Sequence, residues 1–129
     1  MTEKLEIYKC HICGNVVQVL LNGIGELVCC GQAMEKLEPQ NYEENELAEK
    51  HVPKFEQDGD SCFVRLDSHP MIPEHYIQFI EIYPKDKSEL YIKFLRPNEK
   101  AEFNITNLEK DVEALELCNI HGLWRNNND

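Results

Sequence analysis

The sequence predicts an all-β protein in which a small cysteine-rich domain is followed by an antiparallel β-sandwich. Three observations support this fold class. Beyond residue 60, runs of β-branched and aromatic residues recur roughly every ten residues between clusters of Pro, Asn, Asp and Lys. No helical periodicity persists for more than two turns. Four of the six cysteines fall between residues 10 and 30, in a segment too short to bury a stable core.

Residues 1–38 are expected to form the first domain. Apolar and β-branched residues predict short strands at 6–9, 16–20 and 27–28. About 38 residues cannot fold on apolar burial alone, so a cross-link or a metal is expected to hold them together. The polar, acidic stretch 39–46 then reads as a linker that opens onto a short turn or helix, which places the second domain at 39–129.

The second domain is expected to be a sandwich of short strands. The predicted strands span residues 62–66, 76–83, 90–95, 101–105 and 112–117. Cys62 is expected to be a small buried strand residue, and Met71 and Trp124 to pack near a site. Alternation along the strands assigns five charged residues to solvent-facing positions, namely Glu81, Lys93, Glu102, Glu113 and Glu116.

Charge and composition exclude several classes of function. The chain has 129 residues, with 13 basic and 24 acidic side chains and a formal net charge of -11. An acidic protein is a poor partner for nucleic acid or for an anionic membrane surface. No apolar stretch approaches the roughly 20 residues that span a bilayer. The N-terminal residues lack the basic start and apolar run of a secretory signal, so no export is expected.

The first cysteine cluster consists of Cys10-x-x-Cys13 and the adjacent pair Cys29-Cys30. Disulfides are the minority interpretation, because no export signal accompanies them and reduced thiols are the default in the cytosol. Four thiolates in this spacing suit zinc or iron. Spacing alone slightly favours zinc, although the adjacent pair is atypical of zinc ribbons, and the choice of metal stays open on these grounds. His11 is expected to face solvent, because four sulfurs complete the ligand shell.

A second set of metal-binding residues lies in the second domain. His51, His69 and His75 occur beside prolines or at the start of a predicted strand, and Cys118-x-x-His121 has the spacing of a chelating loop. Four imidazoles and one thiolate are too many ligands for structural zinc, which prefers four. Five mixed ligands suit iron and leave one octahedral position vacant, which indicates redox chemistry.

On these motifs the whole chain resembles the desulfoferrodoxins, the two-iron class of superoxide reductase. The first segment is similar to the small, rubredoxin-like desulforedoxin domain, through the four cysteines named above. The second is similar to the neelaredoxin-type catalytic domain. The matching segments there are Glu49-Lys50-His51-Val52-Pro53, His69-Pro70-Met71, His75-Tyr76-Ile77 and Cys118-Asn119-x-His121-Gly122-x-Trp124.

The resemblance implies an immunoglobulin-like sandwich and two iron ions per chain. Cys10, Cys13, Cys29 and Cys30 would form an Fe(S-Cys)₄ centre. The second centre would take His51, His69, His75 and His121 as equatorial ligands and Cys118 as the axial one. The implied reaction is the one-electron reduction of superoxide to hydrogen peroxide. Homodimers, a cytoplasmic location and a rubredoxin-like or other reductase as electron donor are implied as well.

Two non-ligand residues are predicted to act in the reaction. Lys50 is expected to attract superoxide, because screening over about 8 Å leaves local charge to outweigh distant acids. Glu49 would bind the oxidised iron, as the resemblance implies. The Cys118 thiolate is expected to favour electron donation, tuned by backbone amides of residues 119–121. There are two competing interpretations. A non-catalytic electron carrier leaves the histidines unexplained, and a zinc-stabilised binding module gives no role to the second set of metal-binding residues.

Overall fold

A computed structural model describes residues 1–41, 46–108 and 111–126, except for the side chains of Glu46, Leu47 and Glu49. Its internal contacts divide the chain into two compact units, Met1–Glu38 (unit 1) and Pro39–Asp129 (unit 2). Residues 42–45 of the expected linker lie outside the described part. Among the described residues, no helix has the length and apolar character that crossing a bilayer requires.

Unit 1 is a small assembly of very short strands. They are β1 (Ile7–Lys9), β2 (Val16–Gln18), β3 (Val28–Cys29), β4 (Gln32–Ala33) and β5 (Glu35–Lys36). β1 pairs antiparallel with β2 on one side and with β5 on the other, and β3 and β4 form a separate two-stranded ribbon. The buried apolar side chains of this unit are few, with Leu5, Ile7 and Val19 at its centre. Apolar burial alone is therefore a weak support for unit 1.

Unit 2 contains one short helix and seven strands among its described residues. They are α1 (Glu46–His51), β6 (Lys54–Asp58), β7 (Ser61–Arg65), β8 (Ile77–Pro84), β9 (Tyr91–Phe94), β10 (Glu102–Ile105), β11 (Val112–Cys118) and β12 (Gly122–Arg125). The helix follows the expected linker, as the sequence predicts. Its six residues are too few to form a packed layer, so the protein is all-β in class.

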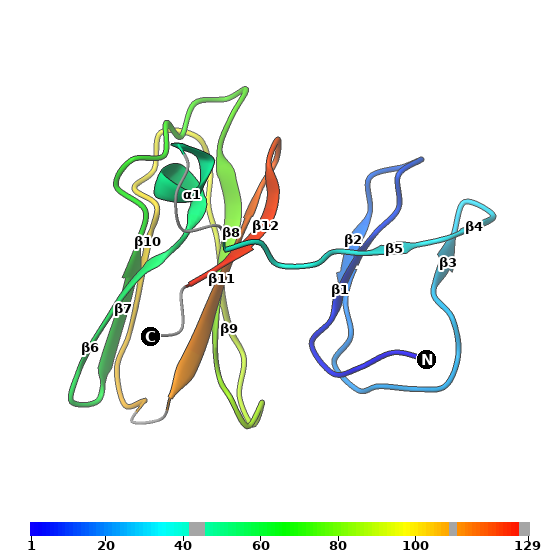
Figure 1. Cartoon of the computed structure of the whole chain (residues 1–129), viewed down its shortest axis with the longest axis horizontal. Coiled ribbons are helices and arrows are strands. Elements are labelled where there is room, and N and C mark those ends of the chain that lie inside the picture. The colour runs from blue at the N-terminus through cyan, green and yellow to red at the C-terminus, as the bar shows by residue number, and fades with distance from the viewer. Residues whose placement is uncertain (42–45, 109–110, 127–129) are drawn as a thin grey trace. The chain divides into compact units, whose positions relative to one another are not determined.

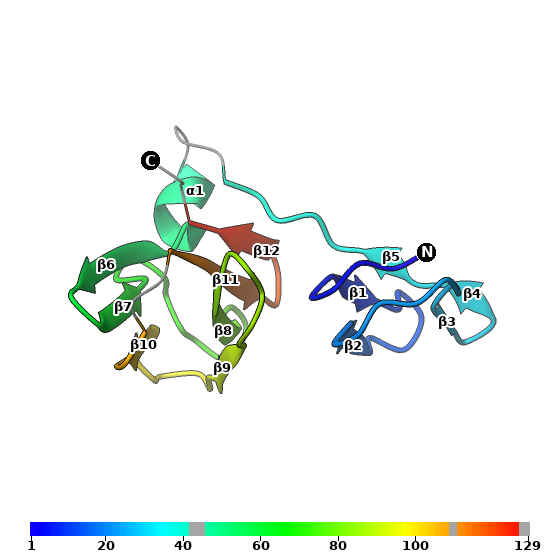
Figure 2. The ribbon, with the colours of Figure 1, turned by 90° about the horizontal axis from the view of Figure 1, so that it is seen from below.

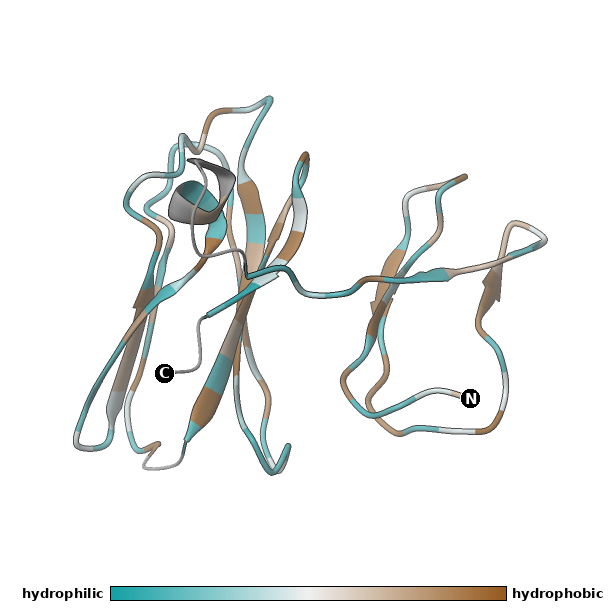
Figure 3. Ribbon diagram, viewed as in Figure 1, coloured by the Kyte–Doolittle hydropathy of each residue, from teal (hydrophilic) through white to brown (hydrophobic). Residues whose placement is uncertain are grey.

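The strands of unit 2 form two antiparallel sheets. One has the order β10-β7-β6 and the other β12-β11-β8-β9, and Figures 1 and 2 show them as two layers. Sheets of three and four strands match an immunoglobulin-like sandwich, and the predicted fold class is confirmed. The space between the sheets is filled by apolar side chains such as Val64, Ile80, Ile82 and Ala114. Brown hydrophobic bands recur along the strands of both sheets in Figure 3.

All five strands predicted in this unit are present, and no predicted end differs from the observed one by more than one residue. Two further strands, β6 and β12, were not predicted. The sequence of β6, Lys-Phe-Glu-Gln-Asp, has one apolar residue, because this edge strand is mostly exposed. β12 is four residues long and begins at a glycine, so it resembles a turn in the sequence. Edge strands and short strands give the weakest sequence patterns. Cys62 lies fully buried on β7, as expected.

The prediction that Glu81 and Glu116 face solvent is wrong. Their exposed fractions are 1% and 0%. β8 and β11 are the two inner strands of their sheet, and runs of consecutive residues on both strands are buried. Alternation of polar and apolar residues assigns a solvent face only where one side of a strand is open. Lys93, on the edge strand β9, is exposed as predicted.

Candidate metal centres

The four cysteines of unit 1 meet in one cluster. Cys10 and Cys13 come from the turn after β1, and Cys29 and Cys30 from the end of β3 and the turn that follows. Their four Sγ atoms lie within 4.8 Å of one another. The Sγ atoms of Cys13 and Cys29 are 3.6 Å apart and those of Cys29 and Cys30 3.9 Å apart, too far for a disulfide bond of about 2 Å. All four thiols are free and converge as the ligands of one metal ion do.

The electrostatics of this cluster also fit a cation. Backbone N–H groups of Cys13 and Ile12 lower the pKa of the Cys10 thiol to about 6. The neighbouring Cys13 sulfur, in contrast, raises the pKa of Cys30 to about 12. Four sulfurs at such distances cannot all ionise without a positive charge between them. A tetrahedral thiophilic metal ion supplies that charge.

The side chains around the cluster complete its surroundings. The Asn15 side-chain amide approaches the Sγ atom of Cys29 at 3.8 Å, which places a hydrogen-bond donor beside one ligand. His11 is exposed and pairs with Glu35, away from the sulfur atoms. The position of His11 agrees with the expectation that it faces solvent.

The predicted ligands of unit 2 come together at one end of the sandwich. His51 ends α1, His69 and His75 lie in the connection between β7 and β8, and Cys118 ends β11. His121 lies in the turn between β11 and β12. Figure 1 shows α1, this connection and this turn at the same end of the two sheets. Residues up to 70 positions apart in sequence therefore meet because the sheets bring three loops together.

The four imidazoles form a closed ring. In the order His51, His69, His75 and His121, neighbouring ring centroids are 4.9, 4.5, 5.0 and 4.9 Å apart, the last distance closing the circle. Each neighbouring pair is close to perpendicular, with interplanar angles from 69° to 87°. Ligand atoms of His51, His69, His75 and Cys118 all lie within 4.8 Å of one another. His121 falls outside that tighter group, but its ring contacts those of His51 and His75.

Burial keeps two of the histidines, His69 and His75, in the neutral form that binds a metal. His51 is completely buried, and His69 is nearly so. Burial, followed by the neighbouring histidines, lowers the pKa of His69 to about 3, and burial also lowers the pKa of His75. Among the described residues, the buried Nε2 atoms of His69 and His75 have no hydrogen-bond partner. Such orphaned nitrogens are costly unless a ligand occupies them, and a metal ion at the centre of the ring satisfies them.

Backbone and side-chain hydrogen bonds hold the β7–β8 connection in place. Met71, in the left-handed region at φ 50°, donates its N–H to His69 Nδ1 at 3.4 Å and accepts the N–H of Ile77 on its sulfur at 3.3 Å. Ile72 and His75 exchange two backbone hydrogen bonds of 3.0 Å. The Asn119 side chain accepts the N–H of Tyr76 and donates to the carbonyl of Glu74, on either side of His75. Met71 therefore packs beside the cluster, as expected.

Cys118 is buried, and its sulfur lies within 4.8 Å of ligand atoms of three of the histidines. Burial raises the pKa of its thiol, while the backbone amides of His121 and Ile120 lower it. The expectation that amides of residues 119–121 point at this sulfur therefore holds for two of the three. The backbone N–H of Asn119 donates instead to the backbone carbonyl of Tyr76, at 3.1 Å. A metal ion is expected to complete the ionisation of Cys118, because a coordinating thiol is deprotonated.

Lys50 and Glu49 both lie on α1, directly before His51. The Lys50 side chain is exposed, and its positive charge is among the causes that lower the pKa values of His69 and His75. Its field therefore reaches the histidine ring. The side chain of Glu49 lies outside the described part of the structure, and only its backbone position on the helix is given.

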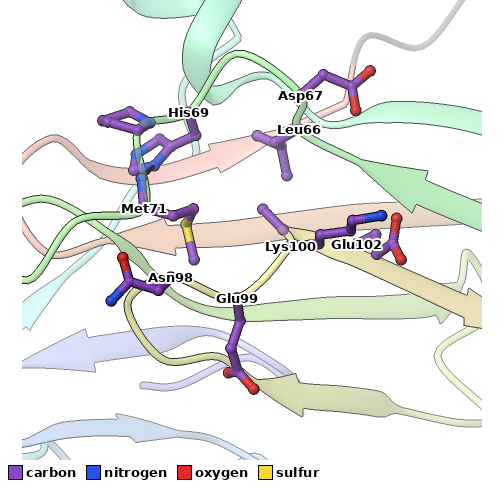
Figure 4. Close-up of a pocket in the computed structure, with 10 residues that line it drawn as sticks. Leu66, Asp67, His69, Met71, Asn98, Glu99, Lys100 and Glu102 are labelled. Atoms are coloured by element: carbon purple, nitrogen blue, oxygen red, sulfur yellow. Dashed lines mark hydrogen bonds between the residues drawn. The ribbon is translucent and has the colours of Figure 1, made fainter.

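An open cavity of about 430 Å³ lies beside His69. Its walls carry the polar side chains of Asp67, Glu99, Lys100 and Glu102, and Met71 lines it close to His69 (Figure 4). The cavity therefore brings solvent to one side of the second cluster.

Two further residues belong to this site. Glu116, two positions before Cys118 on β11, is buried, and burial raises its pKa well above the ordinary value. The position of Glu116 two residues before Cys118 could have indicated that it lies near the site. The alternation of polar and apolar residues instead assigned it to the solvent-facing side. Trp124 stacks on the ring of His51, with centroids 5.1 Å apart, and donates its indole N–H to the carbonyl of His121. Trp124 was expected only to pack near the site.

Comparison with known proteins gives a consistent result along the chain. Residues 2–37 match the family model described as the desulfoferrodoxin N-terminal domain, and residues 43–127 match the model described as desulfoferrodoxin. A desulfoferrodoxin homolog of Archaeoglobus fulgidus is 42% identical over 127 residues, covering 97% of this chain and 98% of that protein. A superoxide reductase of Pyrococcus horikoshii is 32% identical over 97 residues, covering 60% of this chain and 84% of the relative.

Among solved structures, the superoxide reductase from Treponema pallidum superimposes with a TM-score of 0.70 at 24% identity, covering 98% of this chain and 100% of that one. At this identity the similarity establishes the fold.

Proposed function

This chain belongs to the desulfoferrodoxin family, whose two iron centres its two clusters match, and we propose that it is a superoxide reductase. The reaction consumes one superoxide, one electron and two protons and yields one hydrogen peroxide. The observation that carries this proposal is the closed ring of four imidazoles with a buried cysteine beside it. Five such donors leave a sixth position for a small substrate on an octahedral metal.

The protein residues prepare this centre before substrate arrives. Bound ferrous iron would supply the electron, at a centre whose charge with one thiolate is +1. His51, His69, His75, His121 and Cys118 are the residues that would hold the iron. Burial keeps His69 and His75 neutral, so their lone pairs are free for a metal at neutral pH. The amides of Ile120 and His121 stabilise negative charge on Cys118 and so tune how strongly it donates electron density.

Lys50 is the proposed source of attraction for superoxide. The overall charge of -11 repels an anion, but salt screens charges beyond about 8 Å. Lys50 is exposed, lies next to His51, and already acts electrostatically on two histidines of the ring. A single local cation in this position raises the concentration of a small anion at the site. The carboxylate of Glu49, its neighbour, would be a further ligand of the oxidised metal.

Unit 1 is proposed to be the iron–tetrathiolate domain, and its ligands are Cys10, Cys13, Cys29 and Cys30. Residues 39–129 are proposed to form the catalytic domain. Two roles for this first centre make different predictions. As an electron relay it would be needed for reduction by a physiological donor, proposed to be a rubredoxin-like or other reductase. As a structural clip it would be dispensable when an external reductant feeds the second centre directly.

We also propose that the protein works in the cytoplasm as a homodimer. Unit 1 exposes several large apolar side chains, which include Leu20, Leu21, Ile24 and Val28, and contiguous exposed apolar patches mark interaction surfaces. Hydrophobic colour is visible on β2 and β3 in Figure 3. A second copy of the chain is the proposed cover of this surface, and analytical ultracentrifugation tests it by mass.

The proposed activity is tested by metal content and by the products. Protein purified without oxygen is expected to contain close to two iron ions per chain, one for each cluster. With an external electron donor it should consume superoxide and form one peroxide per superoxide, without releasing dioxygen. Dioxygen at half the superoxide consumed would indicate dismutation instead and contradict the proposal. A colourless zinc protein with no effect on superoxide decay would do so as well.

A further inference from the structure

Gln40 extends the sheet of unit 2 beside the strand that follows the Cys118–His121 turn. Its N–H donates to the carbonyl of Leu123 at 3.0 Å, and its carbonyl accepts the N–H of Arg125 at 2.9 Å. These two bonds form a parallel bridge between Gln40 and Trp124 on β12. The backbone of Gln40 is therefore fixed at the edge of the β12-β11-β8-β9 sheet.

The side chain of Gln40 reaches back to the metal-binding turn. Its Nε2 atom donates to the carbonyl of His121 at 3.0 Å and approaches the carbonyl of Leu123 at 3.3 Å. An amide nitrogen has two hydrogens, so it can serve both acceptors. The indole N–H of Trp124 donates to the same His121 carbonyl at 3.0 Å. Two donors from different segments therefore converge on one carbonyl oxygen, which has two lone pairs to accept them.

Gly122 makes room for this contact. Its φ of 84° lies in the left-handed region, where a side chain is strained. A Cβ atom at this position would lie 3.3 Å from the Nε2 atom of Gln40. The turn that carries His121 therefore has a glycine where the Gln40 amide approaches the backbone.

We propose that Gln40 is a positioning residue for His121. By holding the His121 carbonyl, the Gln40 amide fixes the peptide from which the imidazole projects, and so maintains the ring's place beside His51 and His75. This inference rests on the proposed role of His121 as a ligand of the second centre. Hydrogen bonds that orient metal ligands contribute about 10- to 100-fold to metal affinity. Because Trp124 holds the same carbonyl, we expect the lower end of that range.

The test uses the full chain with both centres loaded and the variant Gln40→Met. Methionine keeps the side-chain length and the backbone bridge but removes both donors. We expect the second centre to lose its metal to a chelator about tenfold faster, and its thiolate charge-transfer band to shift. The first centre serves as an internal reference and should release metal at the unchanged rate. The matched control is Gln57→Met, because Gln57 also donates its amide to a backbone carbonyl, that of Leu108, on the other sheet.

A second variant tests the contact from the opposite side. Gly122→Ala should also accelerate metal release, and it should do so less in a Gln40→Ala background, where the added methyl group no longer meets the amide. If Gly122→Ala accelerates metal release equally in the parent and in the Gln40→Ala background, residue 122 and the Gln40 amide are not coupled. An unchanged release rate and band in Gln40→Met, or the same change in Gln57→Met, would overturn the proposal. Failure to find superoxide reduction in the parent would reject the proposed function but leave the release rates interpretable.

Discussion

The two clusters of this protein differ in how much of the surrounding chain is needed to form them. The four cysteines of unit 1 fall within about twenty residues, on two turns, and Cys13 and Cys30 are exposed. The second cluster takes its residues from α1, the β7–β8 connection and the β11–β12 turn, and His51 and Cys118 are fully or nearly fully buried. We therefore expect that in unit 1 a metal stabilises the fold, whereas in unit 2 the fold forms the metal site. The predictions below test this contrast.

The largest expected effect is the loss of unit 1 when its cluster is broken. Cys13→Ser removes one of four ligands, and binding free energy of a structural metal site, on the order of 10 kcal/mol, is also folding free energy. With few buried apolar side chains, unit 1 should lose its dispersed amide NMR signals, while those of unit 2 persist. Cys62→Ala, which removes a buried thiol from β7, is the control and should leave unit 1 intact. A folded, metal-free unit 1 in Cys13→Ser would contradict the contrast.

The reciprocal change in unit 2 should remove function and leave the fold. Cys118→Ser is expected to abolish the thiolate charge-transfer band and to slow superoxide reduction at least about tenfold, a loss of roughly 1.4 kcal/mol in transition-state stabilisation. Since two sheets and their apolar core hold the loops, the amide NMR spectrum of the sandwich should change only near the site. Retention of both the band and the rate would exclude Cys118 as the axial ligand. Cys62→Ser controls for a hydroxyl replacing a buried thiol.

A smaller effect is expected from Lys50→Ala, which alters the approach to the second cluster but none of its ligands. The second-order rate with superoxide should fall severalfold at low ionic strength, and its dependence on salt should flatten, because the local cation is lost. Iron content should not change. Lys85→Ala is the matched control, since this exposed lysine follows β8 at the end opposite His75. Equal rates for Lys50→Ala and its parent at low salt would refute the steering role.

The smallest effect concerns an ion pair that supports unit 1 besides the metal. The Lys36 ammonium lies 2.8 Å from the Glu6 carboxylate and, with the Glu3 amide, lowers the pKa of Glu6 from 4.5 to about 2. A depressed acid pKa stabilises the fold above the unfolded value and ceases to do so as pH falls through the folded value. The stability difference between the parent and Glu6→Gln should therefore be constant above pH 4.5 and vanish towards pH 2.

Thermal unfolding of unit 1, followed by its NMR signals at each pH, measures this difference. The comparison is made at the pH values where unit 1 still binds its metal, and there protonation of the cysteine ligands affects both proteins alike. Glu26→Gln, which alters an exposed acid of the same unit, should show no such pH dependence. A difference that does not shrink as the pH falls below 4.5 would exclude the ion pair as its source.

The sequence indicated which cysteines and histidines cluster better than it indicated their surroundings. Cys10-x-x-Cys13 and Cys118-x-x-His121 are local patterns whose spacing reflects chelation, so they can be read before any fold is known. The burial of Glu81 and Glu116 depends on β8 and β11 being inner strands, and neighbouring strands are not visible in a local pattern. The circular order of the histidines likewise depends on three loops meeting. Gln40 gave no signal, because its partner carbonyl lies 81 positions away.

The position of Gln40 also bears on how the two units can be exchanged. Unit 2 begins at Pro39, yet the next residue is already part of its sheet and of the support for His121. A fusion that replaces unit 1 with a different domain should therefore join the chains before residue 39. A junction at the start of α1 would keep every proposed ligand and still discard an edge of the catalytic unit.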